Sequence, residues 1–412
     1  MKSSVGLSLP EYTFNTSQTA LVIGAGLAGC AIAQALAKRG YHCRVFDQHE
    51  TIAASTSALP AAVIRPATNG DQLFTDYFSY AFDLCCQSID KNLFTQCGSL
   101  ELTDNSERDR VTTDDSRYKL LTADEASTLA GTKVDSAIHI KQAGFVKPQA
   151  LCNHWLAHNN IEIRASTTVD GLRKTQEGWQ LLSDSGAVID ESHVVILATA
   201  QNTVGFDLAS ELPLHCAAGQ IDLFACGGTP LNCIINGNGY LLPDKHGVWC
   251  GATHHPLQTI AGQFEQKQSP IKETDSQTNK ATARHIAQDL SIGASPVASF
   301  ASVRTFTPDR LPVVGALHDT GKYRQNYADL KHGKTNHHYP PPCFHEGLYL
   351  ATGLGSRGAT QALAIGELIS NLLSGDYPGM GDPDNPQRPT AKQLLQALHP
   401  GRFLIRALRR GL

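Results

Sequence analysis

Three closely spaced glycines, Gly24, Gly26 and Gly29, stand between an apolar run and a helical pattern within residues 18–47. In the pattern Gly-x-Gly-x-x-Gly, the first glycine permits a tight turn, the second lets the backbone approach a pyrophosphate, and the third lets the helix pack closely on the strand. Backbone N–H groups at the start of that helix face the phosphates. The motif therefore predicts a Rossmann-like unit that binds a dinucleotide.

An acidic residue after the next strand supports this prediction. A second apolar run, residues 43–46, ends in Asp47, roughly 20 residues beyond the glycines, where a carboxylate accepts both hydroxyls of an adenosine ribose. An acid at this place favours FAD or NAD over NADP. The expected cofactor contacts are Gly24, Ala25, Gly26, Leu27, Ala28, Gly29, Asp47 and Gln48.

Length and composition are typical of a soluble globular protein with two domains: 412 residues, of which 41% are hydrophobic and 17% charged. Residues 1–18 lack a basic region followed by an apolar run, and no stretch reaches about eighteen uninterrupted apolar residues. We therefore expect a cytoplasmic protein without a membrane contact. The net charge of −4 gives no overall attraction to nucleic acid, so a polyanionic partner would need a local basic surface.

The cysteines and histidines do not indicate disulfides or a metal site. The 11 cysteines form no CxxC pair and lie in apolar stretches, which predicts buried thiols. The adjacent pairs His254-His255 and His337-His338 would point to opposite faces of a strand, and no HExxH occurs, so we expect no metal. The absence of GxSxG and GxxxxGK[ST] argues against serine hydrolase and P-loop activities.

Beyond the first unit, strands and helices do not alternate regularly, so the nucleotide-binding domain is expected to be interrupted. Residues 193–198 and the following Thr-Ala predict a buried parallel strand that returns to the first sheet. Residues 353–358, Gly-Leu-Gly-Ser-Arg-Gly, would place backbone donors at the start of a helix. Helices are expected within residues 73–100, 117–130, 148–160, 256–294 and 359–373, and strands at 161–165, 168–175, 179–182, 188–189, within 212–255 and at 347–353.

The order of these motifs resembles that of the FAD-dependent amine and amino-acid oxidases of the D-amino-acid oxidase type, from about residue 19 to 375. Within that group the chain resembles the oxidoreductase half of the bifunctional tRNA 5-methylaminomethyl-2-thiouridine biosynthesis proteins. Their methyltransferase half is not covered, so the resemblance implies a free-standing oxidase. The resembling stretches are residues 53–66, 74–82, 143–152, 217–224, 239–243, 302–315, 353–358 and 399–411.

The resemblance implies a mixed α/β fold of the glycine-oxidase type. A Rossmann-like FAD-binding domain would be interrupted by an antiparallel-sheet substrate domain. The expected parts are an N-terminal extension (1–18), the FAD-binding domain (19–82, 143–205 and 340–375), the substrate domain with insertions (83–142 and 206–339) and a basic C-terminal tail (376–412).

The resemblance also implies roles for two arginines. Arg304 would lie over the flavin and clamp a substrate carboxylate, a task that suits the bidentate guanidinium. The alternative is that Arg304 pairs with Asp309 or caps a strand, while Asp309 and Arg310 are interpreted as turn residues beside prolines. Arg357 would hold the flavin ring or the substrate, or would have only a structural role.

Other cofactor contacts are implied around these arginines. Backbone N–H groups near Arg357 would stabilise the anionic reduced flavin. The backbone at Val169 would bracket the adenine, unless Val169 is an ordinary strand residue. The further expected contacts are Gly353, Leu354, Gly355, Ser356, Arg357 and Gly358 at the helix start, and Ala198 near the dinucleotide.

One loop departs from the pattern of the relatives, which carry a Ser-Gly-Asn turn around the flavin pyrophosphate. This chain has Ser55, Thr56 and Ser57 there, and Pro60 replaces a later glycine. Ser55 is expected to contact the cofactor. Thr56 lacks the positive-φ freedom of glycine, which predicts a different path for the loop.

Two basic stretches with interleaved aromatic residues are candidates for contact with a tRNA backbone. One is residues 322–338, and the other is the tail that carries Arg402, Arg406, Arg409 and Arg410. The alternative is a solvated insertion and an amphipathic tail helix that docks Phe403, Leu404 and Leu408 on the core. The tRNA partner therefore rests mainly on the resemblance.

The resemblance implies an FAD-dependent oxidoreductase that acts on the CH–NH bond of 5-carboxymethylaminomethyl-uridine at the tRNA wobble position. The products would be 5-aminomethyl-uridine and glyoxylate, with oxygen reduced to hydrogen peroxide and a separate methyltransferase acting downstream. Two alternatives stay open: a small-molecule oxidase of glycine, sarcosine or a D-amino acid, and a non-catalytic dinucleotide-binding protein. A closed active-site entrance would favour the first, and a colourless protein that cannot take up FAD would favour the second.

Overall fold

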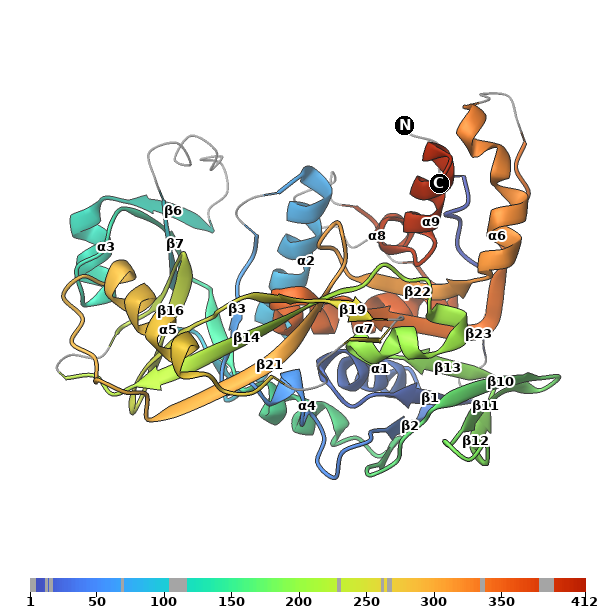
Figure 1. Ribbon diagram of the computed structural model, residues 1–412, viewed down its shortest axis with the longest axis horizontal. Coiled ribbons are helices and arrows are strands. Elements are labelled where there is room, and N and C mark those ends of the chain that lie inside the picture. Colours follow the sequence, from blue (N-terminus) through green and yellow to red (C-terminus); the bar gives the residue numbers. More distant parts are fainter. Residues whose placement is uncertain are drawn as a thin grey trace.

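Two large sheets with their covering helices make up most of the protein (Figure 1). The sheet at the left of the view is flanked by α3 (Ala123–Ala130) and α5 (Glu273–Ile286). The computed structural model describes residues 5–11, 14, 18–67, 70–103, 117–227, 231–260, 263–264, 269–333, 338–377 and 389–412.

The first sheet has six strands. In spatial order they are β22 (Val313–His318), β23 (Phe344–Thr352), β13 (Val194–Leu197), β1 (Thr19–Ile23), β2 (His42–Phe46) and β9 (Ile161–Arg164). Strand β22 is antiparallel to β23, and the other neighbours are parallel. The predicted return of residues 193–198 to this sheet is confirmed, because β13 pairs with β1.

Alternate residues of β1 supply two different cores, as expected for a strand buried on both faces. Ala20 and Val22 pack with the helices on one face, and Leu21 and Ile23 pack with a small sheet on the other. The helices are α1 (Leu27–Lys38), α2 (Gln72–Ser88), α4 (Pro148–Leu156), α7 (Gly358–Ser374) and α8 (Ala391–Leu398), and the small sheet is β10 (Gly171–Thr175), β11 (Gly178–Leu182) and β12 (Val188–Ser192).

Helices α1 and α7 cross closely because small residues lie between them. A Cβ at Gly366 would lie 2.6 Å from the backbone oxygen of Ala31, so α7 approaches the backbone of α1 directly. This contact places the starts of both helices at the same end of the sheet, where the glycine turns lie.

The second sheet has nine strands. They are β18 (His255–Leu257), β14 (His215–Phe224), β17 (Gly247–Gly251), β16 (Gly239–Asp244), β15 (Ile234–Gly237), β5 (Ser99–Leu102), β7 (Ala137–Ile140) and β6 (Tyr118–Leu121), with β21 (Ala298–Phe306) also paired to β14. Helix α3 lies within the range 117–130 in which a helix is expected, and Thr122 caps its start. Strand β22 lies within the range assigned to the substrate domain, 206–339, yet pairs with β23 of the first sheet; the domain boundaries themselves stay a prediction.

A buried carboxylate holds α5 on the second sheet. Asp222 on β14 is fully buried and accepts hydrogen bonds from Asn279 Nδ2 (2.7 Å) and Ser276 Oγ (3.1 Å) of α5. Ser299 of β21 and Gln220 also donate to it. The charge is therefore paired with donors from two strands and a helix, which fixes their relative positions.

The remaining elements connect the two sheets and form the tail. The small strands are β3 (Ala62–Ile64), β8 (Gly144–Val146) and β4 (Phe94–Thr95) in one sheet, and β19 (Thr259–Ile260) with β20 (Gln263–Phe264) in another. Helices α6 (Thr320–Asn326) and α9 (Arg402–Arg410) lie together, with the C-terminus beside them (Figure 1). Val5 and Leu7 pack against the same group of residues.

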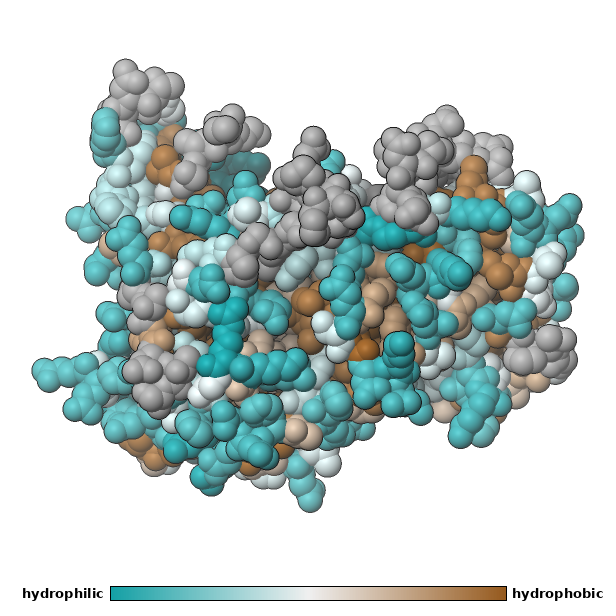
Figure 2. All heavy atoms as spheres, turned by 180° about the vertical axis from the view of Figure 1, so that it is seen from behind, coloured by the Kyte–Doolittle hydropathy of each residue, from teal (hydrophilic) through white to brown (hydrophobic). Residues whose placement is uncertain are grey.

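The cysteines and the surface agree with a globular protein. All 11 cysteines are free thiols that are buried or half-buried, which confirms that prediction. On the face shown in Figure 2, hydrophilic side chains cover most of the coloured surface and apolar ones form separate areas. Within the described ranges, the structure has no helix with the length and apolar character needed to cross a membrane.

Candidate dinucleotide and substrate site

The turn between β1 and α1 leaves no room for side chains at two of its glycines. Gly24 has a φ of +102°, and a Cβ there would lie 2.5 Å from the backbone oxygen of Ala198. A Cβ at Gly29 would lie 1.9 Å from the backbone oxygen of Gly24. Helix α1 begins at Leu27, directly after Gly26, so its first N–H groups lie at this turn.

Asp47 lies beside the turn, at the carboxyl end of β2. Its Oδ2 accepts a hydrogen bond from the N–H of Ala25 (2.8 Å), and its Oδ1 accepts one from the N–H of His49 (2.9 Å). The ring Nδ1 of His49 lies 2.8 Å from the same Oδ1. These contacts fix the carboxylate next to the glycines; His49 has no sequence signal of its own, and Gln48 between them is exposed.

The loop after β2 reaches the start of α1 through Ser57. The Oγ of Ser57 accepts a hydrogen bond from the N–H of Leu27 (3.1 Å), so it occupies one of the free donors of the helix. Ser55, the residue expected to contact the cofactor, is exposed, and its carbonyl accepts from Ala58 (2.9 Å). This role of Ser57 has no local signal in the sequence, because its partner lies 30 residues away.

The replacement of a glycine by Thr56 does not strain this loop. Thr56 begins a 3₁₀ turn, η1 (Thr56–Ala58), and the residue with a left-handed backbone is Ala53, with a φ of +55°. The Thr56 hydroxyl donates to the carbonyl of Val303 on β21 (2.6 Å). Thr56 therefore ties the cofactor loop to the second sheet, one residue from Arg304.

Ala198 and Val169 lie at the same edge of the sheet as Asp47. The N–H of Ala198 donates to the carbonyl of Ile23 (2.8 Å), directly after β13. The N–H of Thr167 donates to the carbonyl of Asp47 (2.8 Å), which brings the segment that contains Val169 to the end of β2. The side chain of Val169 is buried in the core.

A second glycine turn leads into α7. Gly353 and Gly355 have φ values of +75° and +59°, and the turn continues as η6 (Gly355–Arg357). A Cβ at Gly353 would lie 2.6 Å from the side chain of Thr307, just after β21. This turn therefore lies against the end of β21.

Arg304 of β21 reaches this turn. Its Nη1 donates to Ser356 Oγ (2.9 Å), and its Nη2 donates to the carbonyl of Thr253 (2.8 Å). Burial lowers the pKa of the guanidinium from its ordinary value. Ser356 and Thr253 orient the guanidinium, and both partners are neutral.

Three neighbours shape the surroundings of Arg304. A Cβ at Gly219 on β14 would lie 2.5 Å from Arg304 Nη2, so the side chain passes over a position that only glycine leaves open. Burial raises the pKa of Tyr240, with a smaller opposing effect of Arg304, and the phenol stays protonated. Burial and then the charge of Arg304 lower the pKa of His254, which is uncharged at neutral pH.

The sequence around these residues matches a known family. The DAO family, described as FAD dependent oxidoreductase, matches residues 19–372. The chain belongs to this family of FAD-dependent oxidoreductases.

Two relatives carry the name tRNA 5-methylaminomethyl-2-thiouridine biosynthesis bifunctional protein MnmC. The protein of Pseudomonas syringae pv. syringae is 31% identical over 418 residues, which cover 95% of this chain and 59% of the relative. The protein of Stutzerimonas stutzeri is 31% identical over 413 residues, which cover 95% of this chain and 60% of the relative. The chain thus spans about three fifths of the length of these relatives.

Solved structures confirm the mixed α/β fold. Glycine oxidase from Geobacillus kaustophilus superimposes with a TM-score of 0.66 at 18% identity, covering 88% of this chain and 96% of that one. Iminodiacetate oxidase from a Chelativorans species gives a TM-score of 0.66 at 19% identity, covering 87% and 95%.

The cofactor of the DAO family, FAD, fits the residues described above. The glycine turns exclude Cβ atoms where a dinucleotide backbone approaches, and the N–H groups at the starts of α1 and α7 supply donors. The carboxylate of Asp47 stands at the neighbouring strand end, where the ribose of such a cofactor is bound. The turns at Gly24 and Gly355, with Asp47, would hold the cofactor of this oxidoreductase.

Arg357 ends η6, one residue after Ser356, which contacts Arg304. Its Nη1 donates to the carbonyl of Pro66 (3.0 Å), and its Cζ lies 5.0 Å from the ring centre of Phe78. Burial is the main cause that lowers its pKa to about 9, and the charge of Arg65 adds to it. Arg357 is thus half-buried but stays positively charged at neutral pH.

The tail helix α9 uses its first arginine for packing. Arg402 is 2% exposed and forms a two-point pair with Asp309, with distances of 3.0 Å and 2.9 Å, and Arg406 adds a contact of 2.7 Å. Asp309 is therefore paired with α9 and not with Arg304. Because Arg402 is buried, its proposed contact with tRNA is wrong.

The aromatic residues of the insertion are also buried. Tyr323 and Tyr327 are fully buried and pack with Ile405 and Leu408 of α9. Among the described residues of the 322–338 stretch, these rings form a core and cannot stack on bases. The docking of Leu408 on the core is confirmed, while Phe403 and Leu404 are half-buried.

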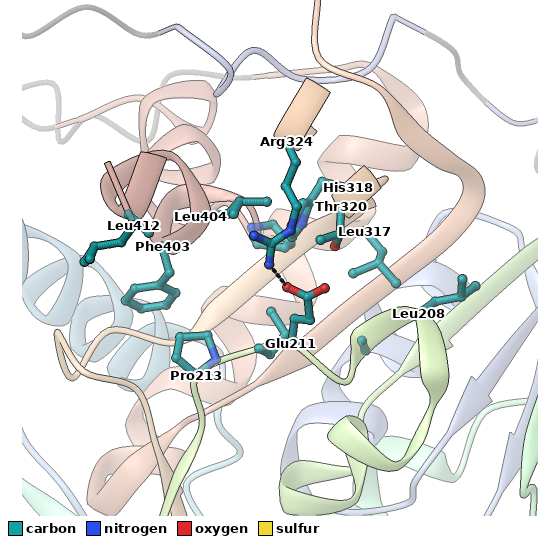
Figure 3. A pocket seen from close by; sticks show the side chains of 14 residues that line it. Leu208, Glu211, Pro213, Leu317, His318, Thr320, Arg324, Phe403, Leu404 and Leu412 are labelled. Atoms are coloured by element: carbon teal, nitrogen blue, oxygen red, sulfur yellow. Dashed lines mark hydrogen bonds and ion pairs between the residues drawn. The ribbon is translucent and has the colours of Figure 1, made fainter. Parts of the chain in front are cut away.

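A pocket of about 250 Å³ lies beside α9 and contains none of the predicted site residues (Figure 3). Leu208, Leu317 and Phe403 line it, and Arg324 reaches across to pair with Glu211. It belongs to the tail region, away from the glycine turns.

No group of three or more metal-ligating side chains occurs in the part of the chain that the structure describes. The two adjacent histidines contact different neighbours, as expected from strand alternation. The ring of His254 lies 5.7 Å from that of Phe306, and His255 Nε2 lies 2.8 Å from Asp275 Oδ1.

Proposed function

We propose that this protein oxidises the CH–NH bond of 5-carboxymethylaminomethyl-uridine at the wobble position of tRNA. The products are 5-aminomethyl-uridine and glyoxylate, and the two electrons reduce oxygen to hydrogen peroxide. The proposal includes a cytoplasmic location and a separate methyltransferase that acts on the resulting primary amine. The names of the relatives and the geometry around Arg304 support it.

The observation that carries the proposal is a half-buried guanidinium whose partners are both neutral. Arg304 donates to Ser356 and to the carbonyl of Thr253, and within the described ranges no acidic side chain pairs with it. A partly desolvated cation without an anionic partner is free to form a strong charge-assisted contact with a carboxylate in the site. The carboxymethyl group of the proposed substrate supplies that carboxylate.

The chain's residues orient the substrate for hydride removal. Arg304 holds the carboxylate, so the adjacent methylene is fixed between the carboxylate and the secondary amine. FAD, when bound, accepts the hydride from this methylene. The amine must be neutral to form the C=N bond, and water then adds to the imine carbon and releases glyoxylate and the primary amine.

Two neighbours of Arg304 add no charge of their own. His254 is uncharged at neutral pH because burial and Arg304 lower its pKa, and Tyr240 stays protonated. The substrate carboxylate is therefore left to Arg304. The positive charge of Arg304, with no acidic side chain paired to it among the described residues, disfavours protonation of the substrate amine and so favours the neutral form that the reaction requires.

Anaerobic reduction of the bound flavin tests the proposal. The purified protein is mixed with tRNA that carries the carboxymethylaminomethyl group, and the visible absorption of the flavin is followed together with glyoxylate release. We expect bleaching of the flavin band with this tRNA, and none with glycine, sarcosine or D-alanine. Bleaching by a free amino acid only would replace the proposal by a small-molecule oxidase.

Cofactor uptake is tested separately with two alanine variants. Gly29→Ala places a Cβ 1.9 Å from a backbone oxygen, whereas Gly205→Ala meets nothing within 4 Å. We expect the first variant to lose FAD and the second to stay yellow. A colourless native protein that takes up no FAD would support a non-catalytic dinucleotide-binding protein instead.

A further inference from the structure

Three arginines from distant parts of the chain converge beside the Arg304 site. Arg65 follows β3, Arg310 lies in the turn between β21 and β22, and Arg357 ends η6. The Cζ atoms of Arg310 and Arg357 lie 5.5 Å and 6.0 Å from the ring centre of Phe74 on α2, so both guanidiniums approach the same ring. The carbonyl of Pro66, next to Arg65, accepts the hydrogen bond from Arg357.

This group, called here the arginine cluster (Arg65, Arg310 and Arg357), adjoins the site of the carboxylate. Arg304 donates to Ser356, and Ser356 precedes Arg357 in the same turn. A ligand whose carboxylate pairs with Arg304 therefore lies next to the cluster. Ser356, which contacts Arg304, and Arg357, which belongs to the cluster, are neighbours in the chain.

The charge of the cluster is not balanced by the acidic side chains that the structure describes around it. Glu101 Oε2 lies 2.7 Å from Arg65 Nη1, while its Oε1 accepts from Asn236 (2.8 Å). Arg65 and Arg310 both lower the pKa of Arg357, and Glu101 opposes them. Three guanidiniums thus face one carboxylate.

The neighbouring acid is directed elsewhere. Asp309 precedes Arg310 in the turn, but its two oxygens pair with Arg402 and Arg406 of α9. The chain keeps Arg310 at a φ of +62°, a left-handed conformation that is costly for a residue with a side chain. The turn therefore separates the acid from the arginine and leaves the guanidinium of Arg310 in the exposed part of the cluster.

The three guanidiniums differ in how far they are already engaged. Arg65 Nη1 forms a close ion pair with Glu101 (2.7 Å), and Arg357 Nη1 donates to the carbonyl of Pro66. Among the residues that the structure describes, no acidic side chain pairs with Arg310, whose guanidinium contacts the ring of Phe74. Neighbouring guanidiniums suit a tetrahedral oxyanion, since each can donate two parallel N–H groups.

We propose that the arginine cluster is a second anion site, which binds a phosphate of the substrate nucleotide while Arg304 binds the carboxylate. The inference rests on the proposed function. It adds that the arginine cluster makes the protein select a nucleotide over a free amino acid. Glycine and sarcosine carry one anionic group and can satisfy Arg304 only. A nucleotide with a carboxymethylaminomethyl group carries two.

Binding of three matched ligands tests this site without turnover. The probes are 5-carboxymethylaminomethyl-uridine and its 5′-monophosphate and 3′-monophosphate, and equilibrium dialysis measures each Kd on FAD-containing protein reduced beforehand. We expect the better phosphate ester to bind the native protein at least ten times more tightly than the nucleoside. An anticodon stem–loop RNA with the same base then shows whether a phosphodiester in RNA fills the site as a terminal phosphate does.

Arg310→Gln should remove most of this preference for the phosphate ester. The double variant Arg65→Gln/Glu101→Gln should do the same without leaving Glu101 as an unpaired carboxylate. The matched control is Arg173→Gln, which removes one exposed arginine of β10 that bonds to Gln180. For the stem–loop, the slope of log Kd against log salt should fall by about one in Arg310→Gln and stay unchanged in the control.

The possible outcomes separate the two proposals. If Arg310→Gln and the double variant keep the native preference for the phosphate ester, the second anion site is wrong. If the preference depends on Arg310 but the carboxymethylaminomethyl group does not reduce the flavin, the anion site stands and the proposed reaction fails. A native protein that binds nucleoside and nucleotide equally also overturns the site.

Discussion

The arginines of α9 and those of the arginine cluster lie on either side of one turn, yet they have opposite relations to charge. Asp309 faces α9, where it pairs with the buried Arg402 and with Arg406. Arg310, the next residue, faces the cluster, where Glu101 is the carboxylate described for three guanidiniums. Arginine therefore stabilises the fold at α9, whereas in the arginine cluster it is available to bind a ligand.

The difference follows from the balance of burial and pairing. A buried charge that is paired and hydrogen-bonded is tolerated, and removal of its partner is strongly destabilising. A charge without a partner contributes little to folding but binds an anion well. We therefore expect variants at α9 to change stability, and variants of Arg304 and the arginine cluster to change catalysis or ligand binding.

The largest expected effect is the loss of catalysis in Arg304→Leu. Without the guanidinium the carboxylate is no longer held, and we expect kcat/KM for the modified nucleoside to fall about 10²- to 10³-fold, or roughly 3–4 kcal/mol. Anaerobic stopped-flow measurement of flavin reduction gives this value. The melting temperature should not fall, because the removed charge is half-buried and has neutral partners only.

Arg304→Lys is the matched control for that variant. It keeps the charge but cannot form the two-point contact, so an intermediate loss is expected. Full activity in Arg304→Leu would mean that another group holds the substrate. The distinction between a ligand-binding Arg304 and the structural arginines of α9 would then lose its main support.

The next largest effect is a loss of stability in Arg402→Met. The substitution leaves Asp309 without its two-point partner in a half-buried place, and we expect the free energy of unfolding to fall by about 3 kcal/mol. Denaturant unfolding measures this value, with Arg410→Gln, which removes an exposed arginine of the same helix, as the control. A stable Arg402→Met protein with impaired flavin reduction would reverse the assignment of the two regions.

The local parts of the site could be predicted from the sequence, and the distant contacts could not. The glycines and Asp47 were identified because a short spacing determines their geometry. Gly219 and Ser57 were missed, since the need for each depends on a side chain or helix end that folding brings from far along the chain. Arg402 was misinterpreted for the same reason: its partner, Asp309, is 93 residues away.

Acidification should weaken the α9 side first. Burial lowers the pKa of His318 to about 4, below its ordinary value near 6.5, and lowers that of His399 as well. Because the folded protein holds both rings uncharged, this stability is complete above about pH 6.5 and is lost as the pH falls towards 4. Each proton taken up on unfolding contributes a slope of up to about 1.4 kcal/mol per pH unit.

Hydrogen exchange at pH 7 and pH 4.5 locates this loss. The two histidines pack around Tyr323, which contacts α9, whereas the arginine cluster keeps its charge over the whole range. We expect protection to fall more in α9 than in α2. An equal loss of protection in both helices would show that the histidines do not weaken one side selectively.

The smallest expected effect is that of Arg406→Gln. Arg406 makes the third contact with Asp309, but its side chain is 49% exposed, and exposed ion pairs contribute about 0–1 kcal/mol. The two-point pair with Arg402, at 2% exposure, remains and continues to hold the pKa of Asp309 below its ordinary value, so most of the stabilisation above about pH 4 is kept. Denaturant unfolding of both variants, Arg406→Gln and Arg402→Met, gives the loss of unfolding free energy for each. The difference between the two losses measures how much the burial of an arginine contributes to stability. If both variants lost the same free energy of unfolding, burial would not be the property that separates α9 from the arginine cluster. The two regions would then differ only in the number of carboxylates that pair with their arginines.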